Sequence, residues 1–118
     1  MDMDLSEINE FMKPFSWMDF ELISVDPQTV ELHGFIDEAY NDKLIIIFSS
    51  VYMLCAPLSF TYDGTGDFIS VADKKQSISI NKAYDVTFGN NVFVFSNTDI
   101  QGDMFIVAKQ FGMKVINL

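Results

Sequence analysis

The stretch from Leu44 to Tyr62 contains no charged residue and constrains the fold more than any other part of the chain. It opens with an unbroken run of β-branched and aromatic residues, Leu44 to Phe48. Ser49 and Ser50 interrupt the run and Pro57 ends it, well short of the roughly 20 apolar residues that a membrane-spanning helix requires. Such a run is typical of a strand inside a sheet, covered on both faces. We therefore expect a central strand there.

The composition is that of one folded, mostly β domain. Hydrophobic residues make up 49% of the 118 residues and charged residues 20%, which is too apolar for a disordered segment. Twelve Phe, four Tyr and one Trp favour strands and supply large rings to a core. A short helix is expected over Leu5 to Lys13, where apolar residues recur at helical spacing before Pro14.

A hairpin is expected over Phe20 to Val25 and Thr29 to Ile36, because Asp26-Pro27-Gln28 is typical of a turn. Apolar and polar residues alternate in its second arm, so Glu31 and His33 are expected to face solvent. We expect no catalytic role for this single histidine.

The C-terminal half reads as short strands separated by turn residues, with a hairpin turn at Gly89-Asn90-Asn91. This spacing predicts a mainly β fold over residues 1–118, either a β-sandwich or a partly open antiparallel barrel, with the helix packed against it. The expected strands are Phe68 to Ala72, Gln76 to Ile80, Tyr84 to Phe88, Val92 to Ser96, Met104 to Lys109 and Met113 to Leu118.

The charge balance restricts the classes of partner. Seventeen acidic residues against seven basic ones give a formal charge of −10, and every basic residue is Lys. A chain without Arg and with this charge is a poor ligand for nucleic acid or for an anionic membrane. The acidic N-terminus does not resemble a secretory signal, so a cytoplasmic location is expected, with Cys55 as a buried, reduced thiol.

Motifs for metal or catalytic chemistry are missing from the sequence. One His and one Cys cannot supply a structural zinc site. The acidic glycine loop Asp63 to Asp67 lacks the ligand pattern of a calcium site, and with no Lys-Ser/Thr pair after it, it is no phosphate loop either. Asp99 to Asp103 is expected to be an ordinary loop as well. We therefore expect a protein without cofactor, metal or enzymatic activity.

Three carboxylates are the candidate binding residues. Asp19 and Glu21 stand two positions apart, so in a strand both side chains point to the same face. The hairpin would bring Glu31 to that face as well. Such a group could be a plain solvated surface, or it could await a cationic partner.

The segment Trp17-x-Asp19-x-Glu21, the hairpin after it and the apolar strand Lys43 to Leu54 resemble the layout of small bacterial immunity proteins of polymorphic or contact-dependent toxin systems. The resemblance implies a cytoplasmic protein without enzymatic activity that binds and blocks a cognate toxin. An acidic surface would suit a basic toxin domain and speed the encounter.

The sequence leaves a second function open, that of a small carrier of apolar ligands. A barrel rich in Phe and Met can leave part of its interior unfilled, and a pocket of several hundred Å³ would then hold the ligand. The uncharged strand region could also lie at a sheet edge and pair with its copy in a homodimer.

Overall fold

The computed structural model describes residues 5–15, 17–26, 28–35, 43–64, 66–84, 90–96 and 104–116. They form two helices and seven strands. In chain order these are α1 (Leu5–Met12), β1 (Met18–Val25), β2 (Thr29–Phe35), β3 (Lys43–Cys55), β4 (Ser59–Tyr62), β5 (Ile69–Val71), α2 (Lys74–Tyr84), β6 (Asn91–Phe95) and β7 (Met104–Ile116).

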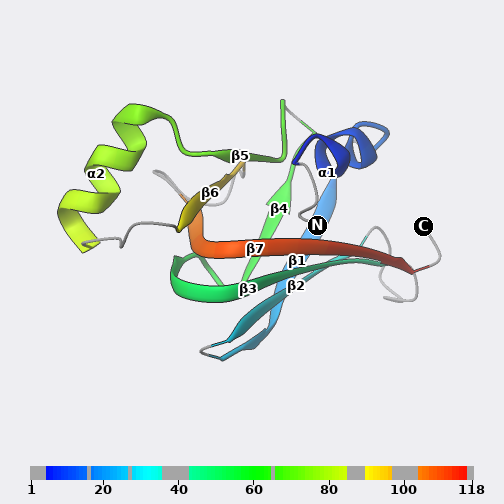
Figure 1. Ribbon diagram of the computed structural model, residues 1–118. Helices are drawn as coiled ribbons and strands as arrows, with labels where there is room; N and C mark the ends of the chain where they lie inside the picture. Colours follow the sequence, from blue (N-terminus) through cyan, green and yellow to red (C-terminus); the bar gives the residue numbers. More distant parts are fainter. Residues whose placement is uncertain are drawn as a thin grey trace.

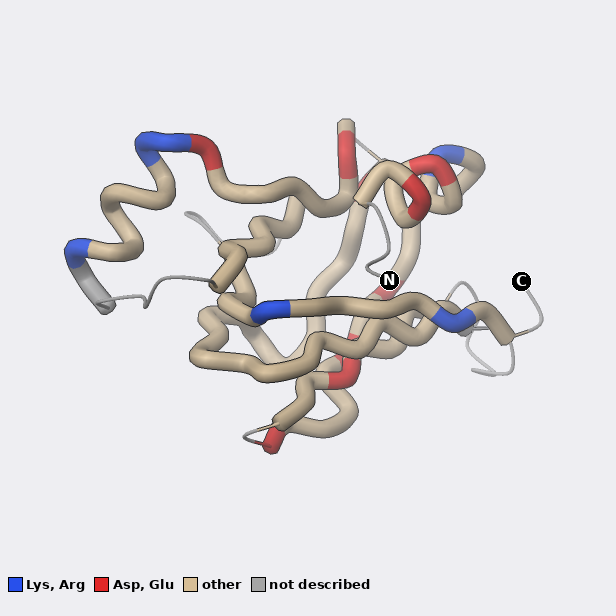
Figure 2. The backbone as a smooth tube through the Cα atoms, in the orientation of Figure 1, with Lys and Arg blue, Asp and Glu red and all other residues tan. Residues whose placement is uncertain are grey.

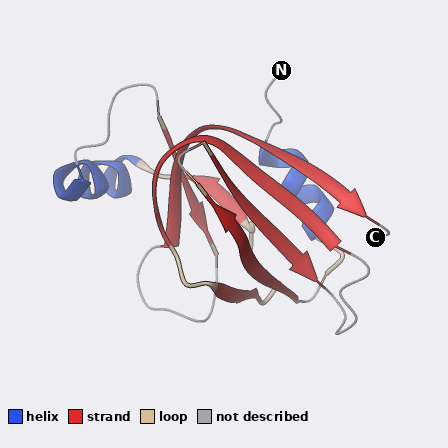
Figure 3. Ribbon diagram, turned by 90° about the horizontal axis from the view of Figure 1, so that it is seen from below, coloured by secondary structure: helices blue, strands red, loops and turns tan. Residues whose placement is uncertain are grey.

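The strands form one antiparallel sheet in the order β4-β1-β2-β3-β7-β6-β5. The sheet curls into a half-barrel, and the long strands β3 and β7 bend along its length (Figures 1 and 3). α1 lies against the inner side of the curl, while α2 lies at the other end of the sheet (Figure 3). The mainly β prediction is confirmed in its partly open barrel form, because the strands make one sheet instead of two packed sheets.

The predicted hairpin is confirmed in β1 and β2, which pair from Asp19 with Phe35 to Val25 with Val30. The side chain of Asp26 closes the turn, since its Oδ1 accepts the backbone N–H groups of Gln28 at 2.8 Å and Thr29 at 2.9 Å. This is the turn chemistry that an Asp at the start of a turn provides. Ile36 lies outside the described residues.

β3 is the middle strand of the sheet, as the uncharged stretch predicts. Leu44, Ile46 and Phe48 are fully buried on the inner face. On the other face, Ile45 and Ile47 are only half-buried. The expectation that both faces of this strand are covered is therefore met in part. Beyond them, Ser50 has a φ of 53° and the register with β7 shifts between Val51 and Met53, a bulge that redirects the end of the strand.

Aromatic rings fill the hollow of the curled sheet. The ring centroids of Phe20 and Phe68 lie 4.7 Å apart, those of Phe20 and Phe60 5.3 Å, and those of Phe68 and Phe95 5.5 Å. α1 adds side chains that are at most 1% exposed, and its described bounds confirm the predicted helix. The members of this main core are Ile8, Met12, Met18, Phe20, Val30, Leu32, Leu44, Ile46, Phe48, Phe60, Tyr62, Phe68, Ile69, Phe93, Phe95, Met104, Ile106 and Ala108.

A second, smaller core lies on the opposite face of β6 and β7 and contains Ile80, Val92, Phe105 and Val107. Ile80 comes from α2, so the strand predicted over Gln76 to Ile80 is wrong. Asp73 starts the helix, because its Oδ1 accepts the N–H of Gln76 at 2.8 Å while Gln76 Oε1 accepts the N–H of Asp73 at 3.0 Å. This reciprocal pair is a capping box, which fixes a helix start.

β7 is one strand, although two were predicted over Met104 to Lys109 and Met113 to Leu118. Its residues around Gly112 stay paired with β3, which removes the expected break. β6 confirms the strand predicted over Val92 to Ser96, and its two neighbours in the sheet are β5 and β7, not the strand predicted over Tyr84 to Phe88. Tyr84 ends α2, and residues 85–89 of the predicted hairpin lie outside the described residues.

The prediction of a buried Cys55 is wrong, because the thiol is exposed. Cys55 is the last residue of β3, beyond the bulge, and it belongs to neither core. The apolar stretch around it therefore does not bury it.

Candidate functional site

The structure brings the three candidate carboxylates onto one face of the sheet. Glu21 on β1 lies opposite His33 on β2, and Glu31 stands two residues before His33. Residues opposite each other in an antiparallel pair, and residues two apart in one strand, share a face. Asp19 shares it too, two residues before Glu21. We call the outward surface that carries Asp19, Glu21, Glu31 and His33 the acidic face.

Asp19 and Glu31 are each held by a neighbour on this face. The Thr61 hydroxyl on β4 donates a hydrogen bond of 2.7 Å to Asp19 Oδ1. His33 Nε2 lies 2.8 Å from Glu31 Oε2. Asp19 is exposed and the two glutamates are half-buried. Both held carboxylates keep a defined direction, which lowers the entropy lost when a partner binds.

His33 is buried, so the prediction that it faces solvent is wrong. Its side chain does lie on the outer face, but that face is covered at this point. Phe35, two residues further along, is also buried, and its ring makes an edge contact with the imidazole at a centroid distance of 6.1 Å. Ile45 is the cross-strand neighbour on β3. The acidic face therefore has an apolar and aromatic border along β2 and β3.

The carboxylates of Asp19 and Glu21 form no ion pair with a lysine within the described ranges. Three lysines, Lys74, Lys75 and Lys82, are instead on α2, at the far end of the sheet. Figure 2 shows these basic positions well away from the acidic positions of β1 and β2. These three lysines therefore do not neutralise the acidic face, and the nearer Lys114 lies on the same side of the sheet, two strands from His33.

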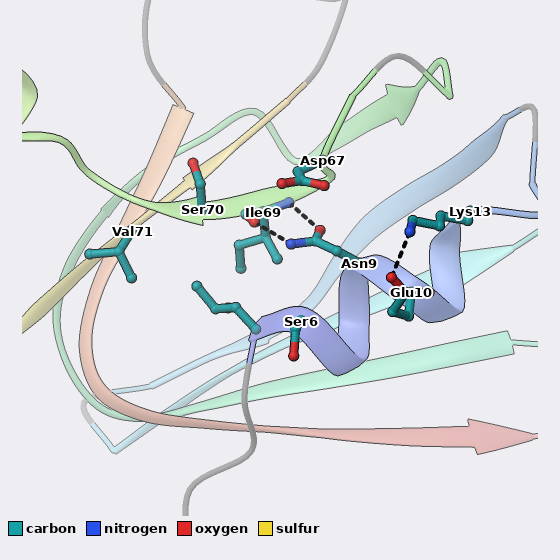
Figure 4. A pocket seen from close by; sticks show the side chains of 9 residues that line it. Ser6, Asn9, Glu10, Lys13, Asp67, Ile69, Ser70 and Val71 are labelled. Carbon is teal, nitrogen blue, oxygen red and sulfur yellow. Dashed lines mark hydrogen bonds and ion pairs between the residues drawn. The ribbon is translucent and has the colours of Figure 1, made fainter.

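A cavity of about 420 Å³ lies elsewhere, between α1 and β5. Figure 4 shows Asn9 at its centre, with Asp67 and the Lys13–Glu10 pair at one end and Val71 at the other. Lys13 Nζ lies 2.6 Å from Glu10 Oε1, and this hydrogen bond and the charge of Glu10 raise the pKa of Lys13. The cavity lies outside the core that the aromatic rings fill. Sequence reasoning missed it, since it depends on how α1 meets β5.

The described residues of the glycine loop after β4, Asp63, Gly64, Gly66 and Asp67, lie outside any helix or strand. Gly64 and Gly66 have φ values of 83° and 69°, which glycine adopts without strain. The Tyr62 hydroxyl donates to the Gly66 carbonyl. Burial raises the pKa of Tyr62, and the nearby charges of Asp63 and Asp67 raise it further. The loop predicted over Asp99 to Asp103 lies outside the described residues.

Over the part of the chain that the structure describes, no group of three potential metal ligands comes together. None of the described helices is long and apolar enough to cross a membrane. No family model, curated protein or solved structure matches this chain.

Proposed function

We propose that this chain is a non-enzymatic interaction module that binds a basic protein partner through its acidic face. The supporting observation is that Asp19, Glu21 and Glu31 share one outward face and that the first two have no lysine partner among the described residues. In the specific form of this proposal the chain is a cytoplasmic immunity protein and the partner is its cognate toxin domain, as the sequence resemblance implies.

Carboxylates gathered on a preformed sheet would act first on the rate of encounter. Their potential draws a basic surface in and orients it before contact. Two of these side chains are already held by Thr61 and His33, and the strands that carry them are paired within the sheet. The buried rings of Phe35 and His33 lie on the same face, beside the carboxylates, and would help to keep it in shape.

The carrier function has less support. A carrier needs an unfilled interior, whereas here stacked and edge-on rings occupy the hollow of the sheet at centroid distances near 5 Å, such as the 5.3 Å between Phe20 and Phe60. The cavity of about 420 Å³ lies between α1 and β5 and is lined partly by charged side chains. An apolar ligand would gain little there.

The test measures the association of this chain with a purified basic toxin domain, taken from the neighbouring gene where that gene encodes one. We expect association to slow by about tenfold or more between low and physiological salt, because screening shortens electrostatic attraction to about 8 Å. The dissociation rate should change much less. Absence of binding, or association that is indifferent to salt, would contradict the proposal.

A pair of charge-matched variants locates the surface. D19N/E21Q/E31Q removes the acidic face, while E7Q/D63N/D73N removes the same charge at other positions and keeps a capping side chain at residue 73. We expect the first variant to lose most of the association rate and the second to lose little. Similar losses in both would show that net charge, and not the acidic face, attracts the partner.

A further inference from the structure

His33 is the only histidine of the chain, and it lies on the acidic face. Its Nε2 is 2.8 Å from Glu31 Oε2, and the side chains of His33 and Glu31 are 11% and 33% exposed. An ionised carboxylate only accepts hydrogen bonds, so Nε2 of a neutral His33 carries the hydrogen of this bond. The neutral ring therefore holds Glu31 without reducing the negative charge of the face.

A proton added to His33 would change that charge. The proton enters at Nδ1, the other ring nitrogen, and turns the hydrogen bond to Glu31 into an ion pair. Taken with the three carboxylates of the acidic face, His33 then lowers the charge from −3 to −2. Because the imidazole is nearly buried, salt screens its charge less than it screens the charge of an exposed side chain.

The charged side chains that face His33 from β1 and β2 are acidic. Glu21 lies opposite His33 in the register, and Asp19 stands two residues before Glu21. Glu31 stands two residues before His33 on its own strand. A positive charge on the imidazole therefore competes with any cation that approaches these three carboxylates.

The other side of His33 has two lysine positions further away. The neighbour on β3 is the uncharged Ile45, and Lys114 on β7 lies opposite Ile45. Lys43 stands on β3 opposite Phe35, the next residue of β2 on this face. Lysine ordinarily stays charged throughout the pH range in which imidazole titrates, so these positions add a constant background.

We propose that His33 is a pH switch of the acidic face, which binds a basic partner best when the imidazole is neutral. This inference rests on the proposed function, because it concerns the regulation of the same surface. Imidazole ordinarily changes its charge between about pH 5 and 8, whereas carboxylates and lysines ordinarily stay ionised there. Binding therefore weakens as the pH falls through this range. By linkage, a bound cation in turn expels the proton from His33.

The test titrates a tetralysine peptide with blocked ends into the full chain, at about pH 7.5 and about pH 5.5 and at one ionic strength, followed by backbone NMR. We expect shifts at Glu21, Glu31 and His33. The dissociation constant should rise about threefold to tenfold from the higher to the lower pH, because protonated His33 takes one of the three carboxylates. The charge of the peptide itself does not change over this range.

H33Q is the matched control. The glutamine amide can donate to Glu31 as the imidazole does, but it does not titrate. We expect H33Q to bind the peptide with nearly the same dissociation constant at both pH values. Any change that persists in H33Q measures the other titrating groups. D19N/E21Q/E31Q should bind the peptide weakly at both pH values.

A second measurement needs no variant. Because the chain has one histidine, its imidazole NMR signals report on His33 alone. At about pH 6, where neutral and protonated imidazole ordinarily coexist, addition of the peptide should move these signals toward their neutral positions. This readout decides the question even if H33Q does not fold.

Two results would overturn the switch and leave the proposed function intact. These are an equal pH response in the wild type and H33Q, and imidazole signals that stay in place while the peptide binds the acidic face. Absence of peptide binding at either pH, or binding that D19N/E21Q/E31Q leaves unchanged, would overturn the switch and count against the proposed function as well. Association with the toxin domain at a single pH tests the proposed function separately.

Discussion

The ring of Phe20 lies directly over Gly34 on the neighbouring strand, with the two residues opposite each other in the register. A Cβ placed on Gly34 would come within 2.6 Å of Phe20 Cε1 and of Met18 Sδ. Both side chains are fully buried, so they have little freedom to move aside. Because Gly34 has no side chain, the ring of Phe20 has room to stack with the other rings on the inner face of the sheet.

We therefore expect Gly34→Ala to lower the free energy of unfolding by about 1–3 kcal/mol through overpacking. Gly112→Ala is the matched control, because a Cβ there meets nothing within 4 Å and Gly112 also lies in a strand. The control should leave stability within about 0.5 kcal/mol of wild type. Urea denaturation of both variants measures the difference, and equal effects would contradict the close approach.

The Asn9 bonds to Ile69 should matter for stability in their own right. Asn9→Ala leaves the N–H and C=O of Ile69, a residue only 1% exposed, without these partners, and we expect a loss of about 1–3 kcal/mol. Asn9→Asp keeps an acceptor but cannot donate, so it should not restore the loss. Glu7→Ala, on the exposed side of α1, serves as the control. Equal stability of the Asn9 and Glu7 variants would refute a stabilising role of these two hydrogen bonds.

Adjacent isoleucines of β3 provide a test of which face is inside. Ile46 is fully buried between Leu32 and Met113, whereas Ile47 lies half-buried on the outer face. Ile46→Thr should cost about 2–4 kcal/mol, because it removes buried carbon and buries a hydroxyl. Ile47→Thr should cost about 1 kcal/mol or less. Ile46→Asp should prevent stable folding, and a soluble, native-like Asp variant would contradict the assigned core.

Sequence patterns predicted the β elements whose neighbours are near in the chain. The hairpin around Asp26 and the buried run Leu44 to Phe48 both follow from local turn chemistry and apolar residues. The helix α2 was mistaken for a strand because Ile78 and Ile80 alternate with serines. The cap formed by Asp73 and Gln76 was the signal that outweighs this alternation.

The site was harder to predict, because burial depends on the whole sheet. Strand alternation placed Asp19, Glu21 and Glu31 on one face, as the structure has them. It could not predict that His33 and Phe35 would be buried on that same face. The cavity between α1 and β5 depends on a contact between Asn9 and Ile69, 60 positions apart, which no local pattern contains.

The exposure of Cys55 leads to a prediction opposite to the one its apolar neighbours indicate. A thiol-specific reagent should label the native protein stoichiometrically without denaturant, since access is the first requirement for reaction. Cys55→Ala should change stability by less than about 0.5 kcal/mol. Labelling that appears only after unfolding would show that the thiol is covered.

The turn at Asp26 predicts a small dependence of stability on pH. Backbone hydrogen bonds from Thr29 and then Gln28 lower the pKa of Asp26 from its ordinary value of 3.8. A carboxylate whose pKa is lowered by folding stabilises the folded state at pH values above its ordinary pKa. This stabilisation is lost as the pH falls through the lowered pKa of the folded state. The gap in melting temperature between wild type and Asp26→Ala should therefore narrow below about pH 4.

Asp26→Asn is the control for this titration. Asparagine keeps the acceptor oxygen but does not titrate, so its difference from Asp26→Ala should not vary with pH over the same range. A gap between wild type and Asp26→Ala that stays constant down to pH 3 would show that the hydrogen bonds to Asp26 do not favour its ionised form.

The ladder between β3 and β7 joins Lys43 to Ile116 at one end and Cys55 to Phe105 at the other. The longest pairing of the sheet, at its centre, therefore joins segments that are distant along the chain. During synthesis, β1 and β2 can pair soon after they leave the ribosome, while the open side of β3 has to wait for β7. Until then it exposes a long, uncharged edge, the kind of surface that promotes aggregation. The order in which the strands are made therefore predicts slower folding than a sheet of local hairpins would show.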